Sequence, residues 1–505
     1  MTSIRLRDNR FGNNGLRFFK QETGVFVSDT SNSEGLGRQK ASEDARKILE
    51  EFGKSTLGDL TRLAGGAIVD LAGSHLDDSE RQKLHFFEYH QKEKEKERFR
   101  LDTGNLMGVL RFRESKGTSL QVEVLSRFDK GSNNFFLNYL LSKAFDVGLG
   151  NDSVTATQPS VLDLLLDVLF VRRLGEATKN GLLRQYRTYR NNDWNFKGRL
   201  DLPRHIRENF PLPHGIAYVK REIDLDVPVN RLLLLAALVV RKRRPDLFER
   251  NEDASDAFRE LRTAIPDPGD IRSVLSHRDC REPVRHPFYR EIWEPLRQIA
   301  RMILEEEKWQ LFHESEEAVS GVVFDGSWLW EEYVASILVP EGFRHCVRGG
   351  DRLYAFADPS RRPFYPDFLS RPTTDHGGVV LDTKYKRSNP TGARSDVHQV
   401  LCYLLLSGSM FGGLVFPPVD CVSETSDDLD EETYGNGETG GWSPPLIVNT
   451  PNAQKSPVIW SCFSWAPIQM TDDWNVFVKT MQEQENDLLK WREVYDKKVL
   501  GGNPK

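Results

Sequence analysis

Two aspartates and a lysine towards the C-terminal end of the chain have a spacing that suits phosphodiester hydrolysis. In the segment FYPDFLSRPTTDHGGVVLDTKYK, residues 364–386, Pro366-Asp367 is followed after fourteen residues by Asp382-Thr383-Lys384. Mg²⁺ prefers oxygen ligands and needs only one or two carboxylates beside a phosphate, and it makes a bound water more acidic. We therefore expect a metal site with Asp367 and Asp382 as ligands, the Thr383 carbonyl as a further ligand, and Lys384 assisting the water.

The residues around this motif predict two adjacent strands that position it. PFYPDFL and GVVLDTKY are strand-like runs, and the spacer between them contains Pro372 and Gly377-Gly378, which are typical of a turn. A hairpin would bring Asp367 beside Asp382. Because side chains alternate along a strand, Asp382 and Lys384 are expected on the same face.

Residues 327–338, SWLWEEYVASIL, have the apolar spacing of a helix just upstream of the hairpin. Glu331 or Glu332 on this helix is a candidate third carboxylate for the site. The alternative is a surface glutamate near a helix start, where the helix dipole favours a negative charge.

A second helix is predicted downstream, in SDVHQVLCYLLLSG, with Ser395 or Asp396 as its cap. Gln399 and Tyr403 are four residues apart and therefore share a face of this helix. Gln399 is a candidate for orienting water or phosphate. Residues 412–417, GGLVFP, follow as a further core strand.

This order of helix, motif-bearing hairpin, helix and strand resembles the PD-(D/E)xK nuclease superfamily. The more specific resemblance is to McrC, the nuclease subunit of the McrBC modification-dependent restriction systems. It is carried by Asp-Thr-Lys-Tyr-Lys at 382–386, by Gln399 with Tyr403, and by Leu-Trp-Glu at 329–331. Further likenesses occur at residues 102–112, 118–128, 181–202 and 221–233, so the resemblance covers residues 100–420. One departure is Leu-Ser-Arg at the end of 118–128, where the family commonly has Pro-Lys.

The resemblance implies an endonuclease subunit of a restriction and anti-phage defence complex. Mg²⁺ would be the cofactor, with Mn²⁺ as a substitute, and double-stranded DNA, modified or not, would be the substrate. The implied partner is an McrB-like AAA+ GTPase hexamer that recognises modified DNA and translocates it. In that family the N-terminal part of McrC docks on the motor ring, which here suggests residues 101–180.

The composition is compatible with this reading. The chain has 505 residues and a formal net charge of −6, so its surface as a whole does not attract polyanions. Residues 344–396 are an exception, with ten Lys or Arg, six Asp and no Glu. Gly53-Lys54-Ser55 lacks the first glycine of a phosphate loop, since position 48 is isoleucine, and no nucleotide-binding loop is found elsewhere.

Five scattered cysteines form no CxxC pair, which argues against a zinc ribbon and for a reducing compartment. The N-terminal residues lack the apolar core of a secretory signal, and the longest apolar runs are too short to span a membrane. We therefore expect a cytoplasmic protein without a membrane segment.

We expect a multidomain α+β fold with a small N-terminal β-containing domain, a helical middle region and a C-terminal α/β PD-(D/E)xK core. The predicted regions are a polar extension with a helix and a charged linker at 1–100, a β-containing partner-docking region at 101–180, a mainly helical region at 181–310, the nuclease domain with an acidic insertion (419–454) at 311–470, and a C-terminal helix at 471–505. Two alternatives stay open. In the first, the chain is a catalytically idle scaffold that stimulates an AAA+ partner. In the second, it is a PD-(D/E)xK nuclease that acts alone.

Overall fold

The computed structural model divides the chain into two compact units, Met1–Leu162 with Ala318–Lys505, and Asp163–Glu317. It describes residues 2–11, 14–21, 25–29, 38–64, 68–71, 82–91, 97–113, 119–129, 134–145, 161–179, 181–212, 214–282, 284, 287–312, 319–346, 352–356, 363–371, 378–386, 393–418, 440–449, 458–467, 471 and 473–500. None of the helices in these ranges combines the length and the hydropathy needed to cross a bilayer.

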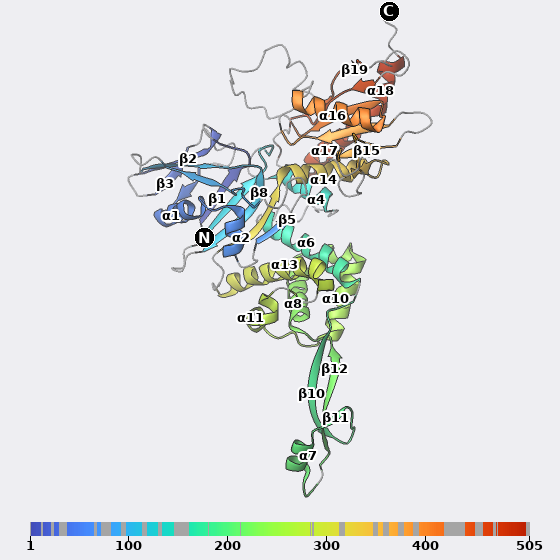
Figure 1. Ribbon diagram of the computed structural model, residues 1–505. Helices are drawn as coiled ribbons and strands as arrows, with labels where there is room; N and C mark the ends of the chain where they lie inside the picture. Colours follow the sequence, from blue (N-terminus) through green and yellow to red (C-terminus); the bar gives the residue numbers. More distant parts are fainter. Residues whose placement is uncertain are drawn as a thin grey trace, which may run out of the picture. The chain divides into compact units, whose positions relative to one another are not determined.

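A five-stranded sheet joins the two chain segments of the first unit, in the order β1-β9-β8-β13-β5 (Figure 1). Its strands are β1 (Thr2–Arg7), β5 (Ile68–Leu71), β8 (Leu106–Arg113), β9 (Ser119–Leu125) and β13 (Val319–Asp325). β13 runs antiparallel to β8 and parallel to β5, which places residue 319 onwards in the same sheet as the N-terminal strands. We call this sheet the N-terminal sheet.

A second five-stranded sheet, β4-β3-β2-β7-β6, shares its hydrophobic core with the N-terminal sheet. Its elements are β2 (Leu16–Lys20), β3 (Phe26–Ser28), β4 (Lys40–Ala41), β6 (Glu88–His90) and β7 (Arg98–Asp102), with helices α1 (Glu43–Phe52) and α2 (Leu57–Leu63). Phe18 and Phe99 stack in this core with ring centroids 4.7 Å apart, and Phe26 packs edge-on against Phe99.

The expectation of a polar extension and charged linker over residues 1–100 is therefore wrong. These residues supply strands to both sheets, and β7 crosses the expected boundary at residue 100. The strands escaped prediction because most are only two to five residues long and are separated by polar segments, so the period-two pattern that marks a strand hardly develops.

An eight-stranded mixed sheet forms the C-terminal part of the first unit, with the main order β14-β15-β16-β17-β20-β19. Its strands are β14 (Arg344–His345), β15 (Phe368–Ser370), β16 (Val379–Thr383), β17 (Phe411–Phe416), β18 (Gly441–Trp442), β19 (Leu446–Val448), β20 (Val458–Trp460) and β21 (Phe463–Ser464). The helices of this part are α14 (Gly326–Leu338), α16 (Arg394–Ser407), α17 (Trp474–Leu488) and α18 (Trp491–Leu500), and α4 (Phe135–Ala144) packs on α14.

The predicted local elements of this part are present. β15 pairs antiparallel with β16, with Phe368 opposite Leu381, and β16 pairs parallel with β17, with Asp382 opposite Leu414. The second helix begins at Arg394 with Ala393 as its N-cap, so the expected caps at Ser395 and Asp396 are wrong. The C-terminal helix is two helices, α17 and α18.

The predicted acidic insertion, residues 419–454, falls largely outside the described residues, which here include only 440–449. Within that stretch, β18 pairs with β21 and β19 pairs with β20. Residues 441–442 and 446–448 of the expected insertion therefore belong to the sheet.

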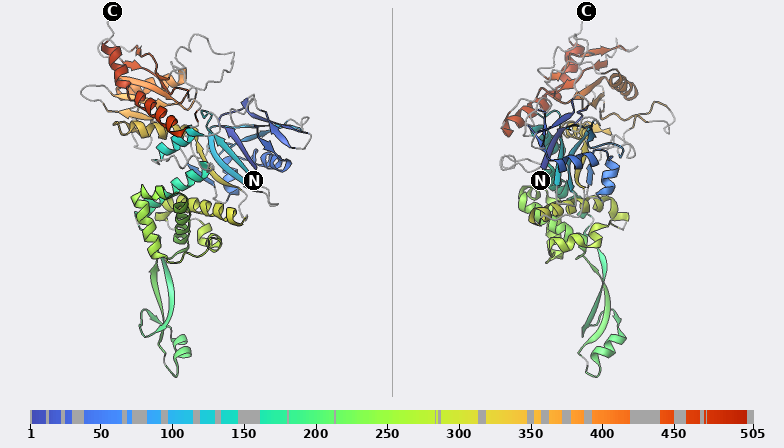
Figure 2. Two further views of the ribbon diagram at one scale, coloured as in Figure 1. Left: turned by 180° about the vertical axis from the view of Figure 1, so that it is seen from behind. Right: turned by 90° about the vertical axis from the view of Figure 1, so that its left-hand side faces the viewer.

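The second unit is a helical body with a long hairpin. The helices are α6 (Val161–Thr178), α7 (Leu202–Asn209), α8 (Pro228–Arg243), α9 (Pro245–Glu249), α10 (Glu252–Ala264), α11 (Ile271–Ser276), α12 (Arg278–Arg281) and α13 (Pro287–Phe312), and the strands are β10 (Gln185–Asp193), β11 (Arg199–Leu200) and β12 (Ile216–Asp224). β10 and β12 pair without interruption from Gln185 with Asp224 to Asp193 with Ile216. Within this unit the hairpin extends away from α8, α10 and α13 in every view (Figures 1 and 2).

The mainly helical region predicted at 181–310 thus begins with a hairpin that the sequence did not reveal. The strand QYRTYRNND is exposed or partly exposed along its whole length. A strand with no buried face has no reason to alternate apolar and polar residues, so the usual strand signal is missing.

Candidate active site

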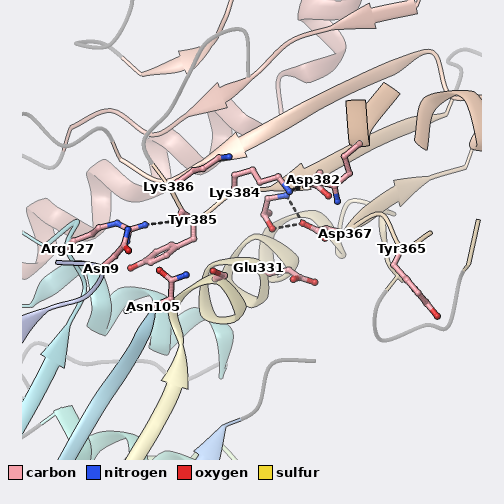
Figure 3. Close-up of a pocket in the computed structure, with 13 residues that line it drawn as sticks. Asn9, Asn105, Arg127, Glu331, Tyr365, Asp367, Asp382, Lys384, Tyr385 and Lys386 are labelled. Atoms are coloured by element: carbon pink, nitrogen blue, oxygen red, sulfur yellow. Dashed lines mark hydrogen bonds and ion pairs between the residues drawn. The ribbon is translucent and has the colours of Figure 1, made fainter. Parts of the chain in front are cut away.

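All six residues predicted for the site line one cavity of about 850 Å³ in the first unit (Figure 3). The lining consists of Asn9, Asn105, Arg127, Ser327, Glu331, Tyr365, Asp367, Asp382, Thr383, Lys384, Tyr385, Lys386 and Gln399. The motif residues come from the start of β15, the end of β16 and the segment that follows it, while Glu331 comes from α14 and Gln399 from α16. The predicted local elements therefore bring these side chains together.

Asp367 is oriented by Thr383 across the hairpin. The backbone N–H and the hydroxyl of Thr383 each donate to Asp367 Oδ2 at 2.6 Å. This contact gives Thr383 a role that the sequence did not predict, in addition to the expected carbonyl ligand. Both of these hydrogen bonds go to Oδ2, so Asp367 Oδ1 takes no part in the contact.

Lys384 connects Asp382 to the helix α16. Its ammonium lies 2.5 Å from Asp382 Oδ2 and donates to Gln399 Oε1 at 3.0 Å. Gln399 Nε2 in turn donates to Tyr403 Oη at 2.8 Å, and that hydroxyl donates to the Tyr365 carbonyl at 2.9 Å. Asp382 and Lys384 therefore do share a face, and Gln399 fixes the lysine instead of pointing freely into the cavity.

Glu331 reaches the cavity from α14 but has a partner of its own. Its Oε1 lies 2.5 Å from Nε2 of the buried His345, whose ring stacks on Phe368 at 5.2 Å. Glu332, the alternative carboxylate on this helix, does not line the cavity. The structure thus selects Glu331, and the contact with His345 holds its carboxylate in place.

The two aspartates of the site resist ionisation. Burial, followed by repulsion from Asp382 and Glu331, raises the pKa of Asp367 well above its ordinary value, although its side chain is partly accessible from the cavity. Burial also raises the pKa of Asp382, against the opposing effect of Lys384. Burial alone would lower the pKa of Lys384, but Asp382 beside it raises that pKa, so the lysine remains an ammonium.

The donor set suits a divalent cation with oxygen ligands. Among the described residues, Asp382 Oδ2 is buried and accepts no hydrogen bond of regular geometry, although the Lys384 ammonium is close to it. A cation would compensate the repulsion between Asp367 and Asp382. In the same part of the chain no three His, Cys, Asp or Glu side chains are grouped as a complete metal site. Such a set of two carboxylates fits Mg²⁺, which keeps several waters, better than a metal that requires a full protein cage.

Several lining residues were not predicted, and they come from distant parts of the sequence. Asn9, Asn105 and Arg127 belong to loops that follow strands β1, β7 and β9 of the N-terminal part. Arg127 belongs to the Leu-Ser-Arg departure from the family pattern, and nothing in its spacing connects it with residues 364–386. His345 is likewise a single histidine with no motif around it.

Comparison with known proteins gives one family match and similarity to two solved structures. A family model described as "McrBC 5-methylcytosine restriction system component" matches residues 101–417. Among solved structures, the chain is similar to a refined half-complex from a tetradecameric assembly of Thermococcus gammatolerans McrB AAA+ hexamers with bound McrC, at 13% identity and a TM-score of 0.45, covering 95% of this chain and 100% of that chain.

It is also similar to the Thermococcus gammatolerans McrBC complex, at 13% identity and a TM-score of 0.30, covering 67% of this chain and 87% of that one. No curated protein matches the chain significantly. The family model spans well over half of the 505 residues and includes the whole Asp-x-Lys motif. The chain belongs to the family of McrBC 5-methylcytosine restriction system components.

Proposed function

We propose that this protein is the McrC-like nuclease subunit of an McrBC-type restriction complex, a Mg²⁺-dependent endonuclease that cuts DNA and works with an AAA+ GTPase. The observation that carries the proposal is the cavity in which Asp367, Asp382 and Lys384 converge with Gln399 and Glu331. The order of the elements around it, α14, β15, β16, α16 and β17, supports the proposal of a PD-(D/E)xK core.

The residues of this chain have distinct roles in the proposed reaction. Asp367 and Asp382 would hold the cation, with the Thr383 carbonyl as a further ligand, and Mn²⁺ would be accepted in place of Mg²⁺. When bound, the cation supplies charge neutralisation at the phosphate and a more acidic water. Thr383 keeps Asp367 in its orientation through two hydrogen bonds.

Lys384 is placed to act on the scissile phosphate or the attacking water. It is a fixed positive charge because Asp382 and Gln399 hold its ammonium from two sides. Preorganised donors of this kind stabilise the charge that develops in the transition state without having to reorient. Glu331 lines the same cavity from α14, and His345 fixes its orientation.

The test is DNA cleavage by the purified chain with its partner ATPase or GTPase, nucleotide and Mg²⁺, for the wild type and for Asp382→Ala. We expect cleavage to fall to background in the variant, while stimulation of nucleotide hydrolysis by the partner remains at the wild-type level. Mn²⁺ binding, followed by electron paramagnetic resonance without DNA, should weaken in the same variant. Undiminished cleavage by Asp382→Ala would contradict the assignment of the site.

The same assay separates the two alternatives. A catalytically idle scaffold would stimulate the partner equally as wild type and as Asp382→Ala, with no DNA cut by either. A nuclease that acts alone would cut DNA without partner or nucleotide. The paired carboxylates and the lysine favour an active subunit over a scaffold, because a scaffold has no use for two carboxylates that repel each other.

The partner we propose is an McrB-like AAA+ GTPase hexamer, and the hairpin of the second unit is the surface that fits a protein partner best. Most of β8 and β9, within the docking region first expected at 101–180, is buried in the N-terminal sheet. Of the twenty large hydrophobic residues exposed in the described part of the chain, nine lie in the segment 185–224: Tyr186, Trp194, Phe196, Leu200, Leu202, Ile206, Phe210, Leu212 and Ile223. Exposed apolar side chains gathered in this way mark interaction sites.

A further inference from the structure

Tyr385, the residue after Lys384, is inserted into a socket formed by the N-terminal sheet and the start of α14. Its hydroxyl lies 2.9 Å from Ser126 Oγ and donates to Met107 Sδ at 3.7 Å. Its ring packs edge-on against Phe128, with centroids 5.0 Å apart. A Cβ atom at Gly326 would approach the ring to 2.6 Å, so the socket requires glycine there.

Arg127 closes this socket and holds the backbone of Tyr385. Its Nη2 donates to the Tyr385 carbonyl at 2.5 Å, and its guanidinium lies over the Tyr385 ring, 4.9 Å from the centroid (Figure 3). Asp8, the residue after β1, supports the arginine, because its Oδ1 accepts the backbone N–H of Arg127 at 2.6 Å and its Oδ2 lies 3.5 Å from Nη1. Arg127 is 8% exposed and Asp8 is fully buried.

This contact is placed where the catalytic strand leaves the sheet. The last backbone hydrogen bond to the neighbouring strand runs from Lys384 N–H to the Val415 carbonyl, at 3.0 Å. The next residue is Tyr385, whose carbonyl Arg127 binds. Lys384 is therefore fixed by β17 on one side and by the N-terminal sheet on the other. Displacements of about 1 Å in a catalytic group can lower a rate about a hundredfold.

We propose that Arg127 is a positioning residue of the nuclease site, which holds Asp382 and Lys384 in their active geometry by binding the Tyr385 carbonyl. The inference rests on the proposed nuclease function and adds to it that the N-terminal sheet controls cleavage through this contact. A direct contact between Arg127 and a DNA phosphate is disfavoured, because its guanidinium already binds Asp8 and Tyr385 and is hardly exposed.

The kinetic test compares Arg127→Met and Arg127→Lys with Arg111→Met. Arg111 is a matched control, since it is buried in the same sheet but donates to Gln121 and not to Tyr385. For Arg127→Met we expect turnover at saturating DNA to fall at least about tenfold, with KM for DNA nearly unchanged and partner stimulation intact. Arg127→Lys should recover part of the rate, because an ammonium can still donate to the Tyr385 carbonyl.

The structural test is amide hydrogen exchange of the peptide that covers residues 379–386, measured without DNA, metal or partner. Arg127→Met should accelerate exchange in this peptide, and Arg111→Met should leave it unchanged. If Arg127→Met folds poorly because Asp8 is left buried without its partner, the double variant Asp8→Asn/Arg127→Met removes that charge and is measured instead.

The outcomes are distinct. Equal rates and equal exchange for Arg127→Met and Arg111→Met would overturn the positioning role, and so would a loss confined to DNA affinity, which would indicate a phosphate contact. If the wild type cuts DNA and Arg127→Met cuts it equally well, the positioning role of Arg127 is refuted but the proposed nuclease function is not. A wild type that cuts no DNA refutes the proposed function and this role with it, even where the exchange of residues 379–386 still responds to Arg127→Met.

Discussion

The cavity of the first unit and the hairpin of the second use their side chains in opposite ways. Around the cavity, charged and polar groups are paired with one another: Lys384 with Asp382 and Gln399, and Glu331 with His345. At the hairpin, large apolar side chains such as Phe210 and Leu212 are 78% and 70% exposed. The first arrangement suits the proposed chemistry, whereas the second suits the proposed binding of a partner protein.

This difference predicts which substitutions should affect DNA cleavage and which should affect binding of the partner. Changes in the cavity should reduce cleavage and leave the partner's nucleotide hydrolysis untouched. Changes at the hairpin should reduce partner binding and leave metal binding in the cavity untouched. A cavity variant that weakens partner binding, or a hairpin variant that weakens metal binding, would show that the two regions share a function.

The largest effect is expected from the lysine of the motif. Lys384→Met should lower the cleavage rate about 100-fold to 1000-fold, the usual cost of losing one preorganised donor at a developing charge, with partner stimulation unchanged. Lys386→Met is the matched control, because Lys386 lines the same cavity but pairs with Asp396. Gel-based cleavage with partner and nucleotide measures both, and equal losses would refute the special role of Lys384.

A second prediction concerns the hairpin. Replacing Trp194, Phe210 and Leu212 by serine should weaken binding to the AAA+ partner at least about 30-fold, as expected for loss of interface anchors worth 2 kcal/mol or more. Mn²⁺ binding to the cavity should stay as in the wild type. The matched control is Tyr354→Ser with Phe356→Ser, two exposed aromatic residues of the first unit. Biolayer interferometry reports both affinities, and a similar loss in the control would contradict the assignment.

A smaller effect is expected one step away from the lysine. Gln399→Ala removes the amide that holds the Lys384 ammonium and should lower cleavage about fivefold to tenfold, in line with about 1 kcal/mol for one hydrogen bond. Tyr403→Phe should cost less, since the Tyr403 hydroxyl reaches Lys384 only through Gln399. In the double variant the rate should fall no further than in Gln399→Ala alone. Additive losses would mean that Tyr403 acts on the site independently.

The sequence predicted the local half of the cavity and missed the distant half. Asp367, Asp382 and Gln399 could be predicted because the motif, the β15–β16 hairpin and the helices α14 and α16 all lie within residues 326–407. Arg127 meets Tyr385 across 258 residues, and that contact depends on β13 joining β8 in one sheet. No local pattern encodes such a pairing. The long hairpin of the second unit escaped prediction for a different reason. β10 has no buried residue and β12 has only two, so the alternation from which strands are predicted is missing or short.

The smallest predicted effect is a pH dependence of stability at Asp8, which shows what a buried charge beside the cavity costs. Burial raises the pKa of Asp8 from 3.8 to about 6, against the opposing effects of Arg127, Arg10 and Arg7. A carboxyl that binds its proton more tightly when folded stabilises the fold below pH 4, and this contribution is lost as the pH rises through about 6. Asp8→Asn should therefore gain stability relative to the wild type as the pH rises.

We expect that gain to be about 1 kcal/mol between pH 5 and pH 7.5, from the last unit of the Asp8 titration, measured by urea unfolding at both values. Because Arg127 lowers the pKa of Asp8, the same comparison in an Arg127→Met background should shift the dependence towards higher pH. A difference between Asp8→Asn and the wild type that stays constant with pH would mean that Asp8 is fully compensated by its arginines. Ionising Asp8 would then cost the fold no more than ionising a surface carboxylate. The difference between the cavity and the hairpin of the second unit would in that case rest only on the exposed apolar residues of the hairpin.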